Sequence, residues 1–144
     1  VCFMTADETG RLAPDDLVED DFADLRSTTN AADYILIAPA AFRSALTPLA
    51  THRATQGRRV KQVNIEDLYD EFNYGVFSPY AIRDFLSYAR ATWVAPAPAY
   101  VVLVGDGTYD YRDYEGGGDV SYIPLKMLHS LVQFYQESIS SLLT

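Results

Sequence analysis

The amino-acid sequence predicts an α/β fold, a three-layer sandwich in which helices cover both faces of a mainly parallel, doubly wound sheet. Two observations support this prediction. Short apolar segments alternate with segments whose apolar residues recur every three or four positions, in the order strand, helix, strand, helix, strand. The apolar segments are also continuous, as is typical of strands buried on both faces. Strands separated by helices are joined in parallel by right-handed crossovers.

The first predicted strand runs from Tyr34 to Ala38 with the sequence YILIA. Pro39 follows it at a position suited to the first residue of a helix. Gly57 is placed to end this helix as the residue after its C-cap. The helix is predicted from one apolar face, formed by Phe42, Ala45, Leu46, Leu49 and Ala50.

The second strand is predicted from Arg59 to Ile65, and its polar character favours a position near a sheet edge. A second helix begins with Ser78 as N-cap and Pro79 as its first residue. The prolines of the segment VAPAPA end it. Its buried face is predicted to consist of Ile82, Phe85, Leu86, Ala89 and Trp93.

The third strand, from Tyr100 to Val104, is apolar on both faces, and we therefore expect it to be covered on both. If the strand order is 2-1-3, the carboxyl ends of the first and third strands, at 38–39 and 105–106, share a crevice. The core of the sheet is predicted to consist of Ile35, Ile37, Val102 and Val104 packed against Phe42, Leu46, Phe85 and Leu86.

The patterns divide the chain into three parts. Residues 1–30 form an acidic lead-in that we expect to be solvated, with order beginning at Asp33. Residues 31–124 form the α/β unit. Residues 125–144 have the spacing of an amphipathic helix, either a native C-terminal helix or the product of a shifted or truncated reading frame. The apolar stripe of this tail is Leu125, Leu128, Val132, Tyr135, Ile139 and Leu142.

Charge and composition exclude several classes of function. The formal net charge of −9 over 144 residues disfavours nucleic acid and anionic membrane surfaces as partners. No apolar run approaches the roughly 20 residues of a membrane-spanning helix. Cys2 is the only cysteine, so an internal disulfide bond is impossible.

The segment after the third strand, GDGTYDYRDYEGGGD, concentrates acidic residues. A dinucleotide fingerprint fails at Asp110, where glycine is required, and an EF-hand loop fails at Tyr111 and Gly117. A phosphoacceptor site lacks the acidic pair after the first strand. Two hypotheses remain: an irregular calcium site with Asp106 and Asp110 as ligands, or a solvated turn in which Asp106 caps backbone N–H groups. No other cofactor is expected.

Neither histidine makes a credible catalytic pair with Cys2. His52 lies near the polar end of the first helix, where a surface or dipole role is expected. His129 follows a stripe position of the predicted tail helix and has no Cys or carboxylate partner in its pattern. We therefore predict that the chain contains no catalytic residue.

Three stretches occur in an order that resembles the gingipain-like (C25) cysteine peptidases. They are LYDEF, followed by a glycine three residues later, then SPYAIRDFL, and then VLVGDGTYDYR. The resemblance covers roughly residues 24–124.

The resemblance implies a caspase-like fold and an endopeptidase with a Cys nucleophile and a His partner. It also implies export to the cell surface or medium, commonly by type IX secretion, and frequent calcium binding. In the family both catalytic residues lie in the second half of the domain, the His within Gly-His-Gly. No such motif occurs here.

The expected function is therefore that of the N-terminal, non-catalytic portion of such a domain. Its partner would be the remaining half, and protein or peptide substrates would bind only to the complete protein, which is either an active peptidase or a sortase-like secretion component. The alternative is a stand-alone α/β binding or scaffold module with calcium in its acidic loop.

Overall fold

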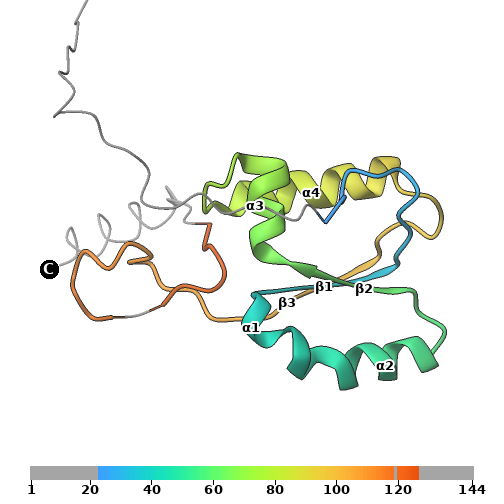
Figure 1. The fold of residues 1–144 in the computed structure, drawn as a ribbon, viewed down its shortest axis with the longest axis horizontal. Helices are drawn as coiled ribbons and strands as arrows, with labels where there is room; N and C mark the ends of the chain where they lie inside the picture. Colours follow the sequence, from blue (N-terminus) through green and yellow to red (C-terminus); the bar gives the residue numbers. More distant parts are fainter. Residues whose placement is uncertain (1–22, 119, 127–144) are drawn as a thin grey trace, which may run out of the picture.

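In the computed structural model, which describes residues 23–118 and 120–126, the chain forms the predicted α/β fold around a three-stranded parallel sheet. Helices α1 and α2 lie on one face of the sheet, and α3 and α4 lie on the other (Figure 1). The elements in chain order are β1 (Tyr34–Ala38), α1 (Ala40–Arg43), the 3-10 helix η2 (Ser44–Leu46), α2 (Thr47–Thr55), β2 (Val60–Asn64), α3 (Ile65–Asn73), α4 (Pro79–Thr92) and β3 (Tyr100–Leu103).

The strand order is β2-β1-β3, the 2-1-3 order considered from the sequence. Tyr34 at the start of β1 is in register with Val60 on one side and with Tyr100 on the other. All five residues of β1 are buried. The expectation that the more polar β2 lies at an edge of the sheet is confirmed.

Successive side chains of β1 point to opposite faces, so the core has two layers. Ile35 and Ile37, each 0% exposed, pack toward α3 and α4 with Phe85. On the other face, Leu36 packs toward α1 and α2 with Leu46. The predicted core residues therefore divide between layers: Ile35, Ile37, Phe85 and Leu86 in the first, and Val102, Val104, Phe42 and Leu46 in the second.

The prediction that the third strand is covered on both faces is wrong for the described structure. Tyr100, Val101 and Leu103 are 48%, 40% and 46% exposed. The apolar run does indicate the interior of a sheet, but within residues 23–118 and 120–126 β3 has a strand partner on one side only. The core layer under α3 and α4 contains neither Val101 nor Leu103.

The helical segments also differ in detail from the prediction. The single helix expected after β1 is divided into α1, η2 and α2, because Pro48 has no N–H and its ring clashes with the preceding turn of a continuous helix. Pro39 is the N-cap of α1 instead of its first residue. Ser78 caps α4 as predicted, its hydroxyl accepting a hydrogen bond from the Tyr80 N–H at 3.2 Å.

Helix α3 is not assigned by the sequence analysis, which leaves its residues as a connection. Its buried residues Ile65, Leu68 and Tyr69 have the three- and four-residue spacing of a helix face. The segment is short and rich in acidic residues, which hides this pattern in the sequence.

Order also begins earlier than the predicted Asp33. Leu25 is 1% exposed, and its carbonyl accepts a hydrogen bond from the indole N–H of Trp93 at 3.0 Å. The Leu25 N–H in turn donates to the Glu71 carboxylate at 3.0 Å. This segment therefore packs against α3 and α4, although its composition is polar.

Two predicted segments fall largely outside the described residues: most of the acidic lead-in, and the tail helix after Lys126. Among the helices of the described part, none has the length and hydropathy needed to cross a membrane.

We predict that Phe85→Ala lowers the free energy of unfolding by about 3–5 kcal/mol, because Phe85 is fully buried and lies against Phe72 and Trp93. Leu103→Ala serves as the control, with an expected change within about 0.5 kcal/mol because its side chain is half exposed. Urea unfolding followed by circular dichroism measures both. Equal losses in the two variants would contradict the assigned core.

Candidate functional site

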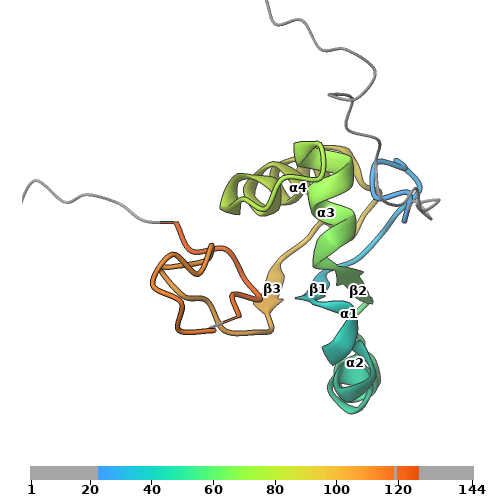
Figure 2. The same cartoon turned by 60° about the vertical axis from the view of Figure 1, so that its left-hand side comes forward.

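The acidic segment after β3 leaves the sheet and returns to it (Figure 2). The return is fixed at Asp106, whose carbonyl accepts hydrogen bonds from the N–H groups of Tyr122 and Ile123 at 2.8 and 3.0 Å. Ile123 is 7% exposed and joins the core layer under α3 and α4. The segment is thus closed onto the carboxyl end of the sheet.

Two glycines permit this closure. A Cβ atom on Gly105, where φ is +140°, would lie 2.8 Å from the Cβ of Tyr122. A Cβ atom on Gly107 would lie 2.6 Å from the carbonyl oxygen of Ile123. The Gly-Asp-Gly sequence is therefore explained by a close approach of two chain segments, without any ligand.

The acidic side chains of this segment bind its own backbone. One carboxylate oxygen of Asp106 accepts from the Gly107 N–H at 2.8 Å. The two oxygens of Asp110 accept from the N–H groups of Tyr114 and Glu115, at 2.9 and 2.7 Å. These contacts stabilise turns, as Asp residues commonly do.

The calcium hypothesis stays a prediction. Each oxygen of Asp110 is already hydrogen-bonded to one N–H group, which leaves fewer lone pairs for a cation. In residues 23–118 and 120–126, no group of three or more His, Cys, Asp or Glu side chains is placed to hold a metal ion. Asp119, the last acidic residue of the segment, lies outside the described residues.

A pocket of about 340 Å³ lies at the carboxyl ends of β1 and β2, and its lining does not include residues 105–106, which were expected to share a crevice with the end of β1. Its walls include Pro39 after β1, Ile65 and Glu66 after β2, and Tyr122 from the returning segment. Tyr69 also lines it, 7% exposed, with no hydrogen-bond partner for its hydroxyl. Burial, and secondarily the charge of Glu66, raise the pKa of Tyr69, so this hydroxyl remains protonated.

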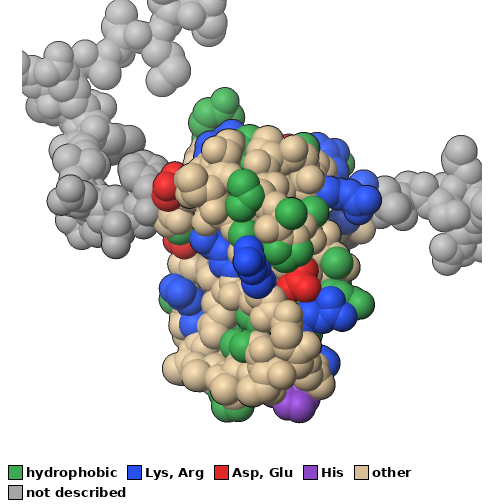
Figure 3. Space-filling model, turned by 90° about the vertical axis from the view of Figure 1, so that its right-hand side faces the viewer, with side chains coloured by type: hydrophobic (Ala, Val, Ile, Leu, Met, Phe, Trp, Pro, Cys, Tyr) green, Lys and Arg blue, Asp and Glu red, His purple; other side chains and the backbone are tan. Residues whose placement is uncertain are grey.

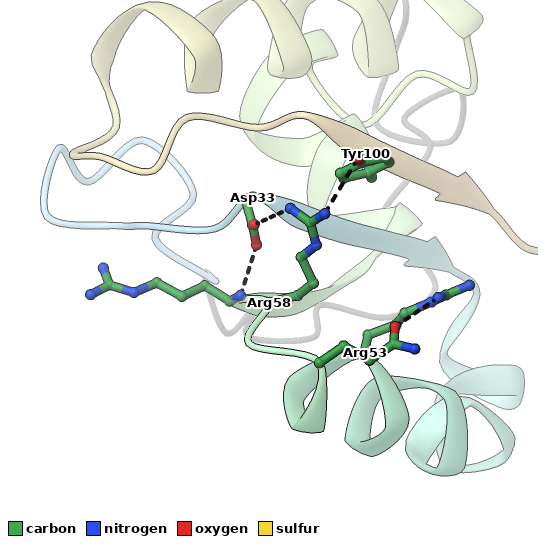
Figure 4. A network of polar contacts seen from close by, with 6 residues as sticks. Asp33, Arg53, Arg58 and Tyr100 are labelled. Carbon is green, nitrogen blue, oxygen red and sulfur yellow. Dashed lines mark hydrogen bonds and ion pairs between the residues drawn. The ribbon is translucent and has the colours of Figure 1, made fainter.

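A second polar network ties together the amino-terminal ends of all three strands (Figure 4). The Asp33 carboxylate accepts from the Arg58 guanidinium at 3.1 Å and from the Arg59 N–H at 2.7 Å, immediately before β2. The Asp33 carbonyl accepts from the Tyr100 N–H at 2.9 Å, at the start of β3. Arg58 also donates to the Tyr100 hydroxyl at 3.4 Å and lies over its ring, 4.7 Å from the centroid.

The electrostatic state of Asp33 follows from these contacts. Desolvation alone would raise its pKa, but the hydrogen bonds from Arg58 and from the Arg59 N–H, with the charge of Arg58, hold the pKa of Asp33 below its ordinary 3.8. Asp33 is thus ionised at neutral pH and pairs with Arg58.

The catalytic candidates are not brought together among the described residues. His52 is exposed in the last turn of α2 and lies 3.3 Å from the Gln56 amide. Cys2 and His129 lie outside residues 23–118 and 120–126. No cysteine occurs within the described part.

Sequence reasoning missed both the Asp33 network and Tyr69. In this network Asp33 contacts Arg58, 25 positions later in the sequence, and Tyr100, 67 positions later. No local pattern signals contacts over such separations. Tyr69 could have been found, because its spacing from Ile65 and Leu68 marks the buried face of an unassigned helix.

Comparison with known protein families relates this chain to a peptidase family. The family model described as "Peptidase family C25" matches residues 27–141. The match includes β1 to β3, the acidic segment and most of the predicted tail. Comparisons with curated proteins and with solved structures gave no match.

We predict that Asp33→Asn lowers the thermal midpoint at pH 7 and that its difference from wild type disappears in acid. The pKa of Asp33 is lower in the folded state than in the unfolded chain, where it is near 3.8. The ionised carboxylate therefore stabilises the fold above about pH 4, and this contribution is lost as the pH falls through the pKa of Asp33 in the folded state. Melts from pH 7 to pH 3 measure the difference. A difference independent of pH would contradict an ionic role.

The calcium hypothesis predicts that millimolar calcium raises the thermal midpoint and that Asp106→Asn or Asp110→Asn removes the rise. If the carboxylates bind only the backbone, Asp110→Asn lowers the thermal midpoint equally in calcium and in EDTA. The substitution replaces one of the two oxygens that accept hydrogen bonds from backbone N–H groups. Asp84→Asn, on the exposed face of α4, is the control for lost negative charge.

Proposed function

Because the chain belongs to peptidase family C25, we propose that it forms the N-terminal, non-catalytic portion of a gingipain-type cysteine endopeptidase domain. The family match over residues 27–141 carries this proposal. In this function the sheet built on β1 supports the catalytic half of the domain and contributes no nucleophile. Proteolysis is then a property of the complete protein.

The residue content supports a non-catalytic role. A cysteine peptidase requires a thiolate and an adjacent base. The histidines stand in the contexts Thr-His-Arg and Leu-His-Ser, neither of which is the Gly-His-Gly of the family. Cys2 lies ahead of the matched residues, so it does not correspond to a family nucleophile.

The open side of β3 supports the proposal that a further part of the domain is its partner. In the described part of the chain, β3 has three residues 40–48% exposed and one edge without a strand partner, an arrangement that native proteins rarely leave uncovered. The remaining half of a peptidase domain would extend the sheet at this edge. The family resemblance also supports export of the complete protein by the type IX route.

We predict no peptidase activity from this chain alone. The purified chain is incubated, under reducing conditions, with peptide substrates that have Arg, Lys or other residues before the scissile bond. The release of a fluorescent leaving group should equal that of a blank without protein. Cys2→Ser is the matched control, and turnover that this substitution abolishes would contradict the proposal.

A further inference from the structure

The free edge of β3 offers both backbone groups and apolar surface. The Tyr100 N–H donates to the carbonyl of Asp33, immediately before β1, and the Val104 N–H donates to the carbonyl of Ile37 in β1, each at 2.9 Å. Because backbone groups alternate sides along a strand, the N–H groups of Val101 and Leu103 point away from β1. An added strand binds such an edge through its main chain, with side-chain contacts that select its sequence.

Arg53 lies beside this edge with an incomplete set of partners. One terminal nitrogen of its guanidinium donates to Gln56 at 2.9 Å, and the group lies 5.5 Å from the centroid of the Tyr34 ring. Its Nε atom is buried and has no hydrogen-bond partner. Among residues 23–118 and 120–126, no carboxylate forms an ion pair with Arg53. Because the Nε atom has almost no accessible surface, a further acceptor would bind the remaining N–H groups of the terminal nitrogens, of which only one nitrogen donates to a described residue.

Arg53 and the β3 edge share one groove of about 490 Å³, which we call the β3 groove. It is lined by Tyr34, Arg53, Gln56, Arg58, Tyr100 and Val102, among others. Of the two arginines that line it, Arg58 is paired with the Asp33 carboxylate, and Arg53 has no such pair among the described residues. Figure 3 shows the face at the amino-terminal ends of the strands, where Lys and Arg cover more of the surface than Asp and Glu. In a chain of net charge −9, this local excess of positive charge favours an anionic partner group.

We infer that the β3 groove receives an extended strand that carries an Asp or Glu side chain, and that Arg53 binds this carboxylate beside Tyr100. The inference rests on the proposed function, because it assigns the strand to the remaining half of the peptidase domain. The added strand hydrogen-bonds to Val101 and Leu103, and its acidic side chain lies on the side of the sheet occupied by α2. Arg58 adds positive charge at the same end of the groove while it remains bound to Asp33.

A peptide of alternating Thr and Val residues with one Glu near each end tests this inference, since either strand direction then brings one Glu to Arg53. The matched probe has Gln in place of both Glu residues. Fluorescence anisotropy measures the affinity of each labelled peptide for the chain. We expect the Glu peptide to bind about tenfold more tightly, the difference that one charge-assisted hydrogen bond supplies. High salt should reduce this difference.

Two variants locate the effect. Arg53→Gln should remove the preference for Glu and leave the affinity for the Gln peptide unchanged. Arg90→Gln, an exposed arginine in the last turn of α4, should leave the preference intact. Equal affinities of the two peptides for the wild-type chain, or a preference that survives Arg53→Gln, would overturn the inference.

Amide chemical shifts separate this inference from the proposed function. Addition of either peptide should shift the N–H resonances of Val101 and Leu103. If both peptides shift them with equal affinity, strand addition holds and only the role of Arg53 is refuted. If neither shifts them, or if sedimentation shows that a second copy of the chain occupies the edge, the assigned partner is refuted as well.

Discussion

β1 is hydrogen-bonded to a parallel strand along each edge and covered by helices on each face, so each of its five residues is buried. Burial of this kind leaves backbone N–H and C=O groups no access to water, and they must be satisfied by β2 and β3. The two core layers are consequences of the same strand, because its alternate side chains begin both of them. Asp33, immediately before β1, accepts hydrogen bonds from the N–H groups of Arg59 and Tyr100 and so joins the starts of β2 and β3 to that of β1.

The parts of the fold that depend on local pattern could be predicted from the sequence. Continuous apolar runs located β1 and β3, and Ser78 with Pro79 fixed the start of α4. The predictions that were wrong concern features that depend on neighbouring residues in the chain or on neighbouring strands in the sheet. Pro48 divided a helix whose apolar spacing was regular, and the acidic residues of α3 concealed a buried face. The exposure of β3 depends on which neighbours a strand has, and its own residues do not encode that.

The candidate sites show a similar division. The acidic composition of the segment after β3 was evident, but its hydrogen bonds to its own backbone depend on turns that residue type alone does not specify. The Gly-Asp-Gly sequence was first considered as a ligand motif, and the structure explains its glycines by the proximity of Tyr122 and Ile123. Arg53 was not considered, because a basic residue near the end of a helix is ordinarily explained by the helix dipole.

The open edge of β3 also has a consequence for the solubility of the chain during synthesis. Chains fold progressively from the N-terminus, so the β1–β2–β3 sheet can form while synthesis of the chain is still under way. During that interval an apolar edge is available for edge-to-edge aggregation between nascent molecules. Arg53 and Arg58 stand beside the start of this edge, so two such edges that approached in parallel register would bring like charges toward each other. Charged residues that flank an exposed strand disfavour edge-to-edge pairing without burying any apolar surface, and Arg53 has such a position beside β3.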